Sequence, residues 1–231
     1  MSATRLPGKP LLKINGLSII SHVFKKAEET NIGEVFVATQ DQEIIDDVKK
    51  NGGQAILTNK NHKTGTDRIN EAIKKLARTD VELVMNLQGD EPLMNVADIQ
   101  KLHAQMVKTK FELGTLASNI TDQESYDNFN VVKVITKESL DNSQFPEAIN
   151  FTRNAETSVN GNHLHHIGLY AYTRSALAKF VQLPQSAREK EEKLEQLRAL
   201  DNHMRIEIGL IDFLPLGVDT PEDLEKMQKL I

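Results

Sequence analysis

The sequence contains no cysteine, which excludes disulfide bonds and thiolate-bound metal ions. It also lacks any apolar run close to the ~20 residues that a membrane-spanning helix needs, so we expect no membrane partner. Positive charge is not in excess either. Its 28 basic residues stand against 33 acidic ones, a net charge of -5 over 231 residues that argues against general nucleic-acid binding. We therefore expect a soluble, cytoplasmic globular protein.

Short apolar runs alternate with helical patterns through the first half of the chain. The strand-like runs lie at 35–38, 55–57 and 83–87, and apolar residues recur at intervals of three and four within 17–27, 44–48 and 69–76. Strand, helix and strand at this spacing predict βαβ units with a mainly parallel sheet. The expected fold class is α/β.

The pattern changes after about Leu113. The elements expected there are strands at 131–135, 148–151, 167–172 and 205–211 and helical stretches at 188–200 and 220–231. Because little helix separates the first three strands, we predict a mixed sheet extension that carries a second binding face. In the closing helix Thr220 suits the N-cap, Pro221 the first turn and Asp223 the third helical position.

The opening segment SATRLPGKP concentrates small and basic residues. Arg5, Gly8 and Lys9 have the make-up of a loop in which backbone N–H groups and cations hold phosphate oxygens. Such loops normally leave a strand and enter a helix; here a helical pattern follows, but no strand precedes. The alternative is an ordinary turn flanked by two surface cations.

Two acidic motifs each follow an apolar run. In NLQGDEP, Asp90 comes directly after the run 83–87, at the kind of strand end where open α/β sheets bind ligands. In GVDTPEDLE, Asp219 follows a second, shorter run. Carboxylates in such places suit Mg²⁺, a hard cation that also takes substrate phosphates. The alternatives are a polar turn for Asp90 and an extra helix cap for Asp219.

A fourth cluster combines HHIGLYAY with the upstream NFTRNAE and the downstream EKLEQLR. The adjacent His165 and His166 alternate across a strand, so only one of them faces a given site. Metal binding is disfavoured because no second pair of ligands lies at a suitable spacing. The alternative is that these strand residues are simply packed and hydrogen-bonded.

In this order, these segments resemble the 3-deoxy-manno-octulosonate (Kdo) cytidylyltransferase family over essentially the whole chain. The likeness is carried by SATRLPGKPLLKING, VFVATQDQEI, NHKTGTDRI, NLQGDEP, HHIGLYAY, EKLEQLRAL and GVDTPEDLE. The resemblance implies a Rossmann-like nucleotide-diphospho-sugar transferase fold and a homodimer. It also implies transfer of CMP from CTP to Kdo, with release of pyrophosphate, in lipopolysaccharide biosynthesis.

The resemblance further implies a single domain over 1–231. In it 1–112 mainly binds nucleotide, 113–210 serves sugar binding and dimerisation, and 211–231 supplies the returning strand end and the C-terminal helix. It matches Arg5 and Lys9 to the triphosphate cations and Asp90 and Asp219 to the Mg²⁺ ligands, and these four are the expected catalytic residues. The matched loop near the base and ribose is Thr64, Gly65, Thr66, Asp67 and Arg68, and the matched sugar pocket is Gln88, Arg153, His166, Tyr170, Glu195 and Gln196. Arg153 is the expected partner of the Kdo carboxylate.

Three departures from the family pattern stand out. The family's VATD reads VATQ here, with Gln40 at the acidic position and Asp41 next to it. Residues 154–157 replace the usual Pro-containing turn after Arg153. The family's opening apolar strand and IPAR-like turn have no counterpart ahead of Met1, so we expect a chain of this form to lack an interior strand and one nucleotide-binding cation.

Two other functions stay open. One is a cytidylyltransferase for another sugar acid such as sialic acid, against which RLPGKPL and LEQLR argue. The other is an inactive nucleotide-binding protein, which the absent strand favours and the presence of both Asp90 and Asp219 disfavours.

Overall fold

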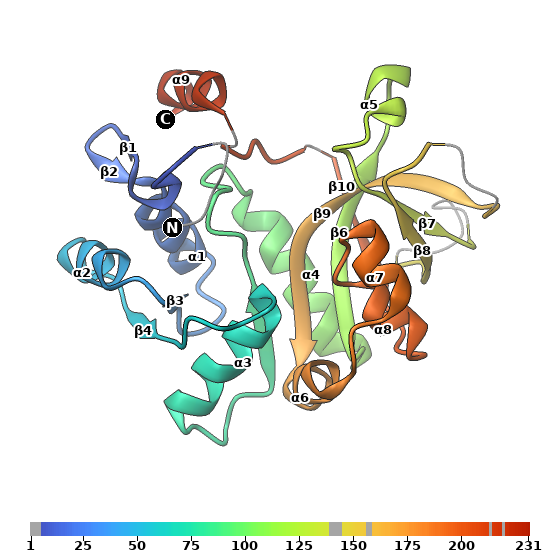
Figure 1. Cartoon of the computed structure of the whole chain (residues 1–231), viewed down its shortest axis with the longest axis horizontal. Coiled ribbons are helices and arrows are strands. Elements are labelled where there is room, and N and C mark those ends of the chain that lie inside the picture. Colours follow the sequence, from blue (N-terminus) through green and yellow to red (C-terminus); the bar gives the residue numbers. More distant parts are fainter. Residues whose placement is uncertain (1–5, 139–144, 156–158, 213, 219) are drawn as a thin grey trace. The chain divides into compact units, whose positions relative to one another are not determined.

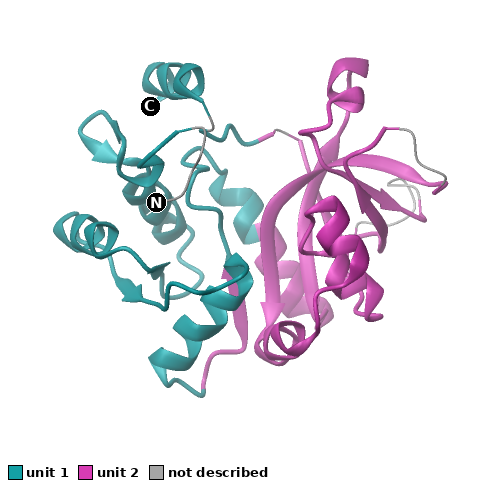
Figure 2. Ribbon diagram, viewed as in Figure 1, with its two compact units in different colours: residues 1–79, 86–100, 215–231 teal, residues 80–85, 101–214 magenta. Residues whose placement is uncertain are grey.

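The computed structural model describes residues 6–138, 145–155, 159–212, 214–218 and 220–231 (Figure 1). The chain divides into two compact units (Figure 2). Unit 1 comprises 1–79, 86–100 and 215–231, and unit 2 comprises 80–85 and 101–214. The family resemblance predicts that the whole chain acts as a single domain, and this stays a prediction. Among the described residues, no helix combines the length and the apolar character that a membrane crossing requires.

Unit 1 is built from short strands and amphipathic helices. Its elements are η1 (Lys9–Leu11), β1 (Lys13–Ile14), β2 (Leu17–Ser18), α1 (Ile19–Glu29), β3 (Val37–Thr39), α2 (Gln42–Lys50), β4 (Ala55–Leu57), α3 (Gly65–Leu76), the start of α4 (Val96–Thr109) and α9 (Pro221–Leu230). Strands β3 and β4 pair in parallel, with Val37 opposite Ala55. This is the parallel pairing predicted for the first half of the chain.

Two apolar clusters hold unit 1 together. Ile20 and Phe24 of α1 pack with Ile44 and Val48 of α2, as their three- and four-residue spacing predicts. A second cluster brings the C-terminal segment to the opening one, because the buried side chains of Ile14, Ile19, Val218 and Met227 pack together. Burying such side chains stabilises each by about 1.5–3 kcal/mol. Helix α9 is therefore anchored on the residues that follow the opening loop.

The start of α9 forms as predicted. The Thr220 hydroxyl accepts a hydrogen bond from the Asp223 N–H at 3.2 Å, and the Asp223 carboxylate accepts one from the Thr220 N–H at 3.0 Å. Pro221 occupies the first helical turn, where no N–H partner is needed. This reciprocal capping box satisfies two backbone donors that the helix itself leaves without partners.

Unit 2 is a six-stranded mixed sheet with helices. Its elements are β5 (Leu83–Asn86, whose last residue belongs to unit 1), the end of α4, β6 (Leu113–Asn119), α5 (Gln123–Asp127), β7 (Lys133–Thr136), β8 (Ala148–Thr152), β9 (Asn162–Thr173), α6 (Arg174–Gln182), α7 (Ala187–Glu192), α8 (Leu197–Asp201) and β10 (Glu207–Ile211). The strand order is β10-β6-β9-β7-β8, and β5 also pairs with β9. Strand β10 runs parallel to β6, whereas the β6–β9, β9–β7 and β7–β8 pairs are antiparallel. The predicted α/β fold with a mixed sheet extension is therefore confirmed.

One predicted helix is interrupted. We expected a continuous helical stretch over 188–200, but α7 ends at Glu192 and α8 begins only at Leu197. Lys193 has φ 55°, in the left-handed region, and a helix cannot continue through that backbone conformation. The charged composition of the stretch gave no signal for this break. Its consequence is that Glu195 and Gln196, two expected sugar-pocket residues, lie in the connection between the two helices.

Candidate active site

In unit 1 an ion pair joins the opening loop to the acidic motif. The Lys9 ammonium donates to Asp90 Oδ2 at 2.6 Å, across 81 positions of sequence. Gly8 has φ 70°, a left-handed conformation that glycine adopts readily, and the resulting turn starts η1 at Lys9. The Asp90 side chain is 36% exposed, so the pair stands at an accessible surface rather than in the core. Two residues expected at the phosphates are thus brought together.

The C-terminal segment reaches the same acidic residue. Val218 donates its N–H to the Asp90 carbonyl at 3.0 Å, and a Cβ built on Gly217 would lie 3.7 Å from that oxygen. Val218 itself is fully buried, which fixes this approach. Residue 219 and the first five residues lie outside the described part of the chain, so the expected roles of Asp219 and Arg5 stay predictions.

The residues around Asp90 fit a hard cation held together with substrate phosphates. Its half-exposed carboxylate already binds one cationic group, the Lys9 ammonium. Within the described ranges, no three His, Asp or Glu residues gather as a complete metal site. A single accessible carboxylate suits the Mg²⁺ mode in which one or two protein ligands act with phosphate oxygens and water.

The expected base and ribose loop is held at the start of α3. Thr64 caps the helix by accepting from the Asp67 N–H at 3.3 Å. Arg68 reaches back from the first turn and donates to the Thr58 hydroxyl at 2.6 Å and to the Gln40 side-chain carbonyl at 3.0 Å. The ends of β3 and β4 are thereby tied to the loop by one guanidinium. Gln40, which departs from the family pattern, therefore accepts one of these two hydrogen bonds from the Arg68 guanidinium.

A second anchor in this loop was not recognised from the sequence. Glu71 of α3 accepts from the Asn59 N–H at 3.0 Å, pairs with Lys75 at 2.8 Å and contacts His62. The hydrogen bond from Lys75, with those from His62 and Asn59, lowers the pKa of Glu71 to about 2. The carboxylate therefore stays ionised and holds the loop between Asn59 and His62.

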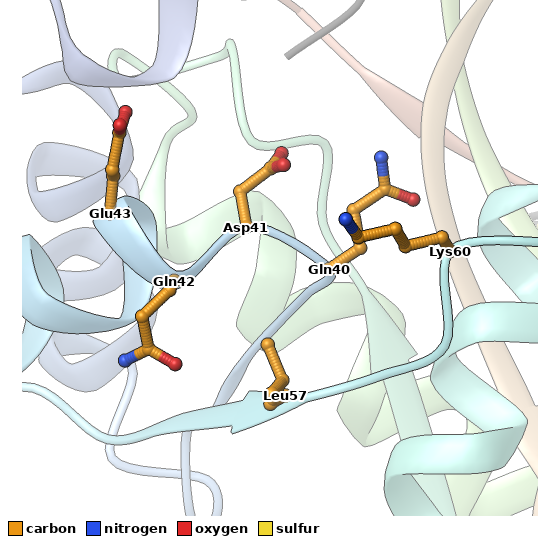
Figure 3. Close-up of a pocket in the computed structure, with 6 residues that line it drawn as sticks. All are labelled: Gln40, Asp41, Gln42, Glu43, Leu57 and Lys60. Atoms are coloured by element: carbon orange, nitrogen blue, oxygen red, sulfur yellow. The ribbon is translucent and has the colours of Figure 1, made fainter.

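A shallow pocket of about 430 Å³ opens where β3 and β4 end (Figure 3). It is lined by Gln40, Asp41, Gln42, Glu43, Leu57 and Lys60. Figure 3 shows Gln42 pointing away from the carboxylates of Asp41 and Glu43. The pocket lies at the carboxyl ends of two parallel strands, the place where ligands bind in sheets of this class.

In unit 2, a bulge in β9 determines how the expected sugar residues lie. The pairing of β6 with β9 jumps between Thr115 and Leu116, so that Gly168 and Leu169 are extra residues in β9. The buried Thr115 hydroxyl lies 3.0 Å from the Ile167 carbonyl and 2.7 Å from the Leu169 carbonyl. With its single proton, this hydroxyl can donate to either of these two backbone oxygens beside the irregular pairing.

His166 lies within this arrangement as a neutral ring. Its Nε2 is 3.2 Å from the Thr115 hydroxyl, and the ring packs edge-on against Phe151 and beside Tyr170. Part of the residue reaches solvent, but burial of the ring, together with the nearby His165, lowers the pKa of His166 to about 3. The imidazole is thus uncharged at neutral pH and interacts by hydrogen bonding, not by charge.

Tyr170 connects His166 with the break between α7 and α8. Burial raises the pKa of Tyr170, and the nearby Tyr172 and Glu195 raise it further. Its hydroxyl makes no hydrogen bond of normal geometry within the described ranges, although Thr115 is close enough to lower the pKa slightly. Gln196, at the N-cap of α8, is buried. His166, Tyr170 and Glu195 are therefore neighbours, and their role at the sugar stays a prediction.

Arg153 follows β8 directly and is held by backbone oxygens. Its Nε donates to the Glu192 carbonyl at 3.3 Å and its Nη1 to the Phe129 carbonyl at 3.4 Å. The guanidinium carbon also lies 5.8 Å from the centre of the Phe129 ring. Arg153 forms no ion pair with any residue that the structure describes, in contrast to Lys9. A cation arranged in this way can accept a carboxylate ligand.

The remaining expected sugar residue, Gln88, belongs to unit 1 and is exposed two positions before Asp90. Sequence reasoning missed Thr115, Phe129 and Lys133, which contact the expected residues of unit 2. Only Lys133 carried a signal, because a lysine inside the apolar run 131–135 is unusual for a buried strand.

Comparisons with known proteins show which family this chain resembles. Residues 1–206 match the family described as "Cytidylyltransferase". Proteins named 3-deoxy-manno-octulosonate cytidylyltransferase from Afipia carboxidovorans and Paramagnetospirillum magneticum are 45% and 43% identical to this chain. Each alignment covers 100% of this chain, with 93% of the Afipia protein and 94% of the Paramagnetospirillum protein.

Solved structures show the same likeness. CMP:2-keto-3-deoxy-manno-octonic acid synthetase complexed with CTP superposes with a TM-score of 0.88 at 36% identity, over 99% of this chain and 93% of that one. Apo-UDP-glucose pyrophosphorylase superposes with a TM-score of 0.72 at 13% identity, over 100% and 94% of the two chains. The second likeness concerns the fold alone.

Proposed function

Because this chain belongs to the 3-deoxy-manno-octulosonate cytidylyltransferase family, we propose that it transfers CMP from CTP to Kdo. Pyrophosphate is released and CMP-Kdo is formed. The observation that carries the proposal is the 45% identity to a relative of that name over the whole chain. The solved relative complexed with CTP supports the choice of nucleotide.

The charges of unit 1 suit the triphosphate. Lys9 lies at the start of a turn beside Asp90, and with Arg5 it would neutralise phosphate oxygens as the Kdo hydroxyl approaches the α-phosphate. The Arg68 contacts to Thr58 and Gln40 would keep the 64–68 loop in place for the base and ribose. Holding two anionic reactants in line is the main contribution that a protein makes to such a transfer.

We further propose Mg²⁺ dependence. Asp90 and Asp219 would hold the ion, and the ion would withdraw charge from the phosphate oxygens. The supporting observation is that Val218, the neighbour of residue 219, is hydrogen-bonded to the Asp90 backbone. Lys9 would then exchange its contact with Asp90 for one with a phosphate oxygen.

The side chains of unit 2 suit a sugar acid. Arg153 offers a guanidinium without a carboxylate partner among the described residues, and this planar fork matches a carboxylate with two parallel hydrogen bonds. His166 and Tyr170 offer neutral polar groups beside apolar rings, which fit sugar hydroxyls and carbon faces. A cytoplasmic location, a homodimer and a role in lipopolysaccharide biosynthesis are parts of the same proposal.

The direct test is product formation. Purified protein is incubated with CTP, Mg²⁺ and either Kdo or sialic acid, and the nucleotide sugar is identified by mass spectrometry while pyrophosphate is measured. CMP-Kdo with Kdo, and no product with sialic acid, is expected. If product forms with sialic acid but not with Kdo, the protein is instead a cytidylyltransferase for sialic acid. CTP binding by calorimetry without any turnover would identify an inactive nucleotide-binding protein.

A further inference from the structure

Among the described residues of unit 2, Lys133 is the largest fully buried side chain with an ionisable group. It lies on β7 opposite Thr152 of β8 and His165 of β9, and its residue surface is 0% exposed. Burying an ammonium group is costly unless its donors find partners. Burial lowers the pKa of Lys133, which the exposed Asp127 partly opposes and Arg153 reinforces. A methionine or leucine would fill this interior position without that cost.

The ammonium group finds its partners on two separate segments. Lys133 Nζ donates to the Asn128 carbonyl at 2.8 Å and to the Arg153 carbonyl at 3.0 Å. Asn128 follows α5, and Arg153 follows β8, so the two oxygens are 25 positions apart in sequence. Lys133 therefore ties the backbone of Arg153 to the turn after α5.

The same turn also holds the side chain of Arg153. Phe129, next to Asn128, accepts a hydrogen bond from Arg153 Nη1 at 3.4 Å, and its ring lies under the guanidinium at 5.8 Å. The Phe129 residue is 60% exposed, which is unusual for a large apolar side chain. A ring at this distance attracts the cation through its electron-rich face. With the Glu192 carbonyl on Nε, these contacts leave Nη2 and the second N–H of Nη1 without a hydrogen bond to any described residue.

We propose that Lys133 and Phe129 are positioning residues, which fix the backbone and the guanidinium of Arg153 so that its outer N–H groups face the carboxylate of the sugar acid. This inference rests on the proposed function and adds two residues to it. Lys133 fixes the backbone position of Arg153 at the end of β8. Phe129 fixes the plane of the Arg153 guanidinium. Because a bidentate carboxylate contact depends on that plane, loss of either residue should weaken sugar-acid binding while nucleotide binding is unchanged.

The test compares the Michaelis constants for the two substrates in single variants. Lys133→Met keeps the length and apolar stem but removes both hydrogen bonds, and we expect KM for Kdo to rise about 10-fold with KM for CTP within about 2-fold. Phe129→Ala removes an exposed ring, so it should fold normally and raise KM for Kdo by about 3-fold.

Matched controls separate positioning from general destabilisation. Val134→Ala shortens the fully buried side chain next to Lys133 on β7. The Val134 side chain points to the opposite face of the sheet from Lys133, because successive residues of a strand alternate between the two faces. This variant should lower the melting temperature without changing the ratio of the two KM values. Val107→Ala removes another exposed apolar side chain of unit 2, at 57% exposure, and is the control for Phe129→Ala.

A double-mutant cycle decides whether the two residues act through Arg153. In an Arg153→Lys background, where the planar fork is already lost, Lys133→Met and Phe129→Ala should change KM for Kdo by less than about 2-fold. Full additivity would overturn the proposal, as would unchanged KM ratios in both single variants. If Lys133→Met does not fold, Phe129→Ala and its double-mutant cycle with Arg153→Lys are sufficient to test the proposal. Absence of CMP-Kdo formation by the unaltered protein would instead contradict the proposed function, before any variant is compared.

Discussion

Unit 1 presents two of its expected catalytic residues, Lys9 and Asp90, as an ion pair, whereas unit 2 presents two of its expected sugar residues, His166 and Tyr170, as uncharged rings. Lys9 and Asp90 neutralise each other at an accessible surface. His166 and Tyr170 are kept uncharged by burial, and Arg153 forms hydrogen bonds to carbonyl oxygens instead of an ion pair in the described structure.

The difference corresponds to the two substrates. A triphosphate brings several negative charges, and mobile ion pairs can exchange partners to receive them. A sugar acid brings one carboxylate and many hydroxyls, for which a fixed cation and preorganised neutral groups are better suited. If this comparison is right, variants in unit 1 should change the rate, and variants in unit 2 should change sugar affinity.

The largest effect is expected for Asp90→Asn, which retains size but removes the charge that pairs with Lys9. Turnover should fall by at least about 100-fold with little loss of thermal stability, because the proposed Mg²⁺ would lose one of its two carboxylate ligands. Steady-state pyrophosphate release measures it. Glu34→Gln, which breaks the exposed pair with Arg78, is the control and should retain full activity. Normal turnover in Asp90→Asn would remove Asp90 from the site.

Arg153→Lys should give the next largest effect. It keeps the charge but loses the planar fork, so KM for Kdo should rise at least about 10-fold while KM for CTP stays within about 2-fold. Arg205→Lys serves as the control in unit 2, since the exposed Arg205 side chain pairs with Glu147 at the surface. An equal rise in both constants would point to a structural role for Arg153 and would break the comparison between the units.

A smaller effect, on stability alone, is expected from Glu207 of β10. Burial, with the charges of Glu147 and Glu112, raises the pKa of Glu207 from 4.5 to about 7, against the opposing effect of Arg205. Between these two values the folded protein binds a proton that the unfolded chain has released, so stability falls as the pH rises from about 4.5 through about 7.

Glu207→Gln should therefore raise the melting temperature by a few degrees at pH 8 and change it little at pH 4, with activity at pH 8 unchanged. Thermal melts across that pH range measure the difference. Glu191→Gln, which makes the same substitution at an exposed residue of α7, is the control. A lower melting temperature for Glu207→Gln at pH 8 would contradict the sign of this argument.

The smallest effect is expected at the cap of α9. Thr220→Ala removes the acceptor of the Asp223 N–H and should cost about 1 kcal/mol, or a few degrees in melting temperature. Thr220→Ser keeps the acceptor and should behave like the unaltered protein. Both variants should retain turnover, since the hydroxyl is a helix cap and not a ligand. A large loss of activity in Thr220→Ala alone would show that the cap and the neighbouring site cannot be separated.

The sequence predicted those features that depend on local chemistry. The capping box at Thr220 and Asp223, the pairing of β3 with β4 and the apolar faces of α1 and α2 follow from residue type and spacing. The family resemblance supplied Lys9, Asp90 and Arg153 as site residues, and their exact roles stay predictions.

Features that depend on long-range packing could not be predicted in this way. The break at Lys193 has no glycine or proline to mark it, although the backbone there is left-handed. The Thr115 hydroxyl became important only through a bulge in β9, which periodicity does not reveal. Lys133 was recognisable as an unusual lysine within an apolar run. Its two hydrogen-bond acceptors, however, lie on segments that the sequence alone does not bring together.

The pairing at one end of the unit 2 sheet bears on how the protein avoids aggregation. Strands β8 and β10 stand at opposite ends of the strand order, yet Ala148 donates to the Ile206 carbonyl at 2.8 Å and Ile208 to the Pro146 carbonyl at 2.9 Å. The sheet is thus partly closed on itself. Exposed strand edges invite addition of strands from other chains, and closure removes donors and acceptors that such addition would use.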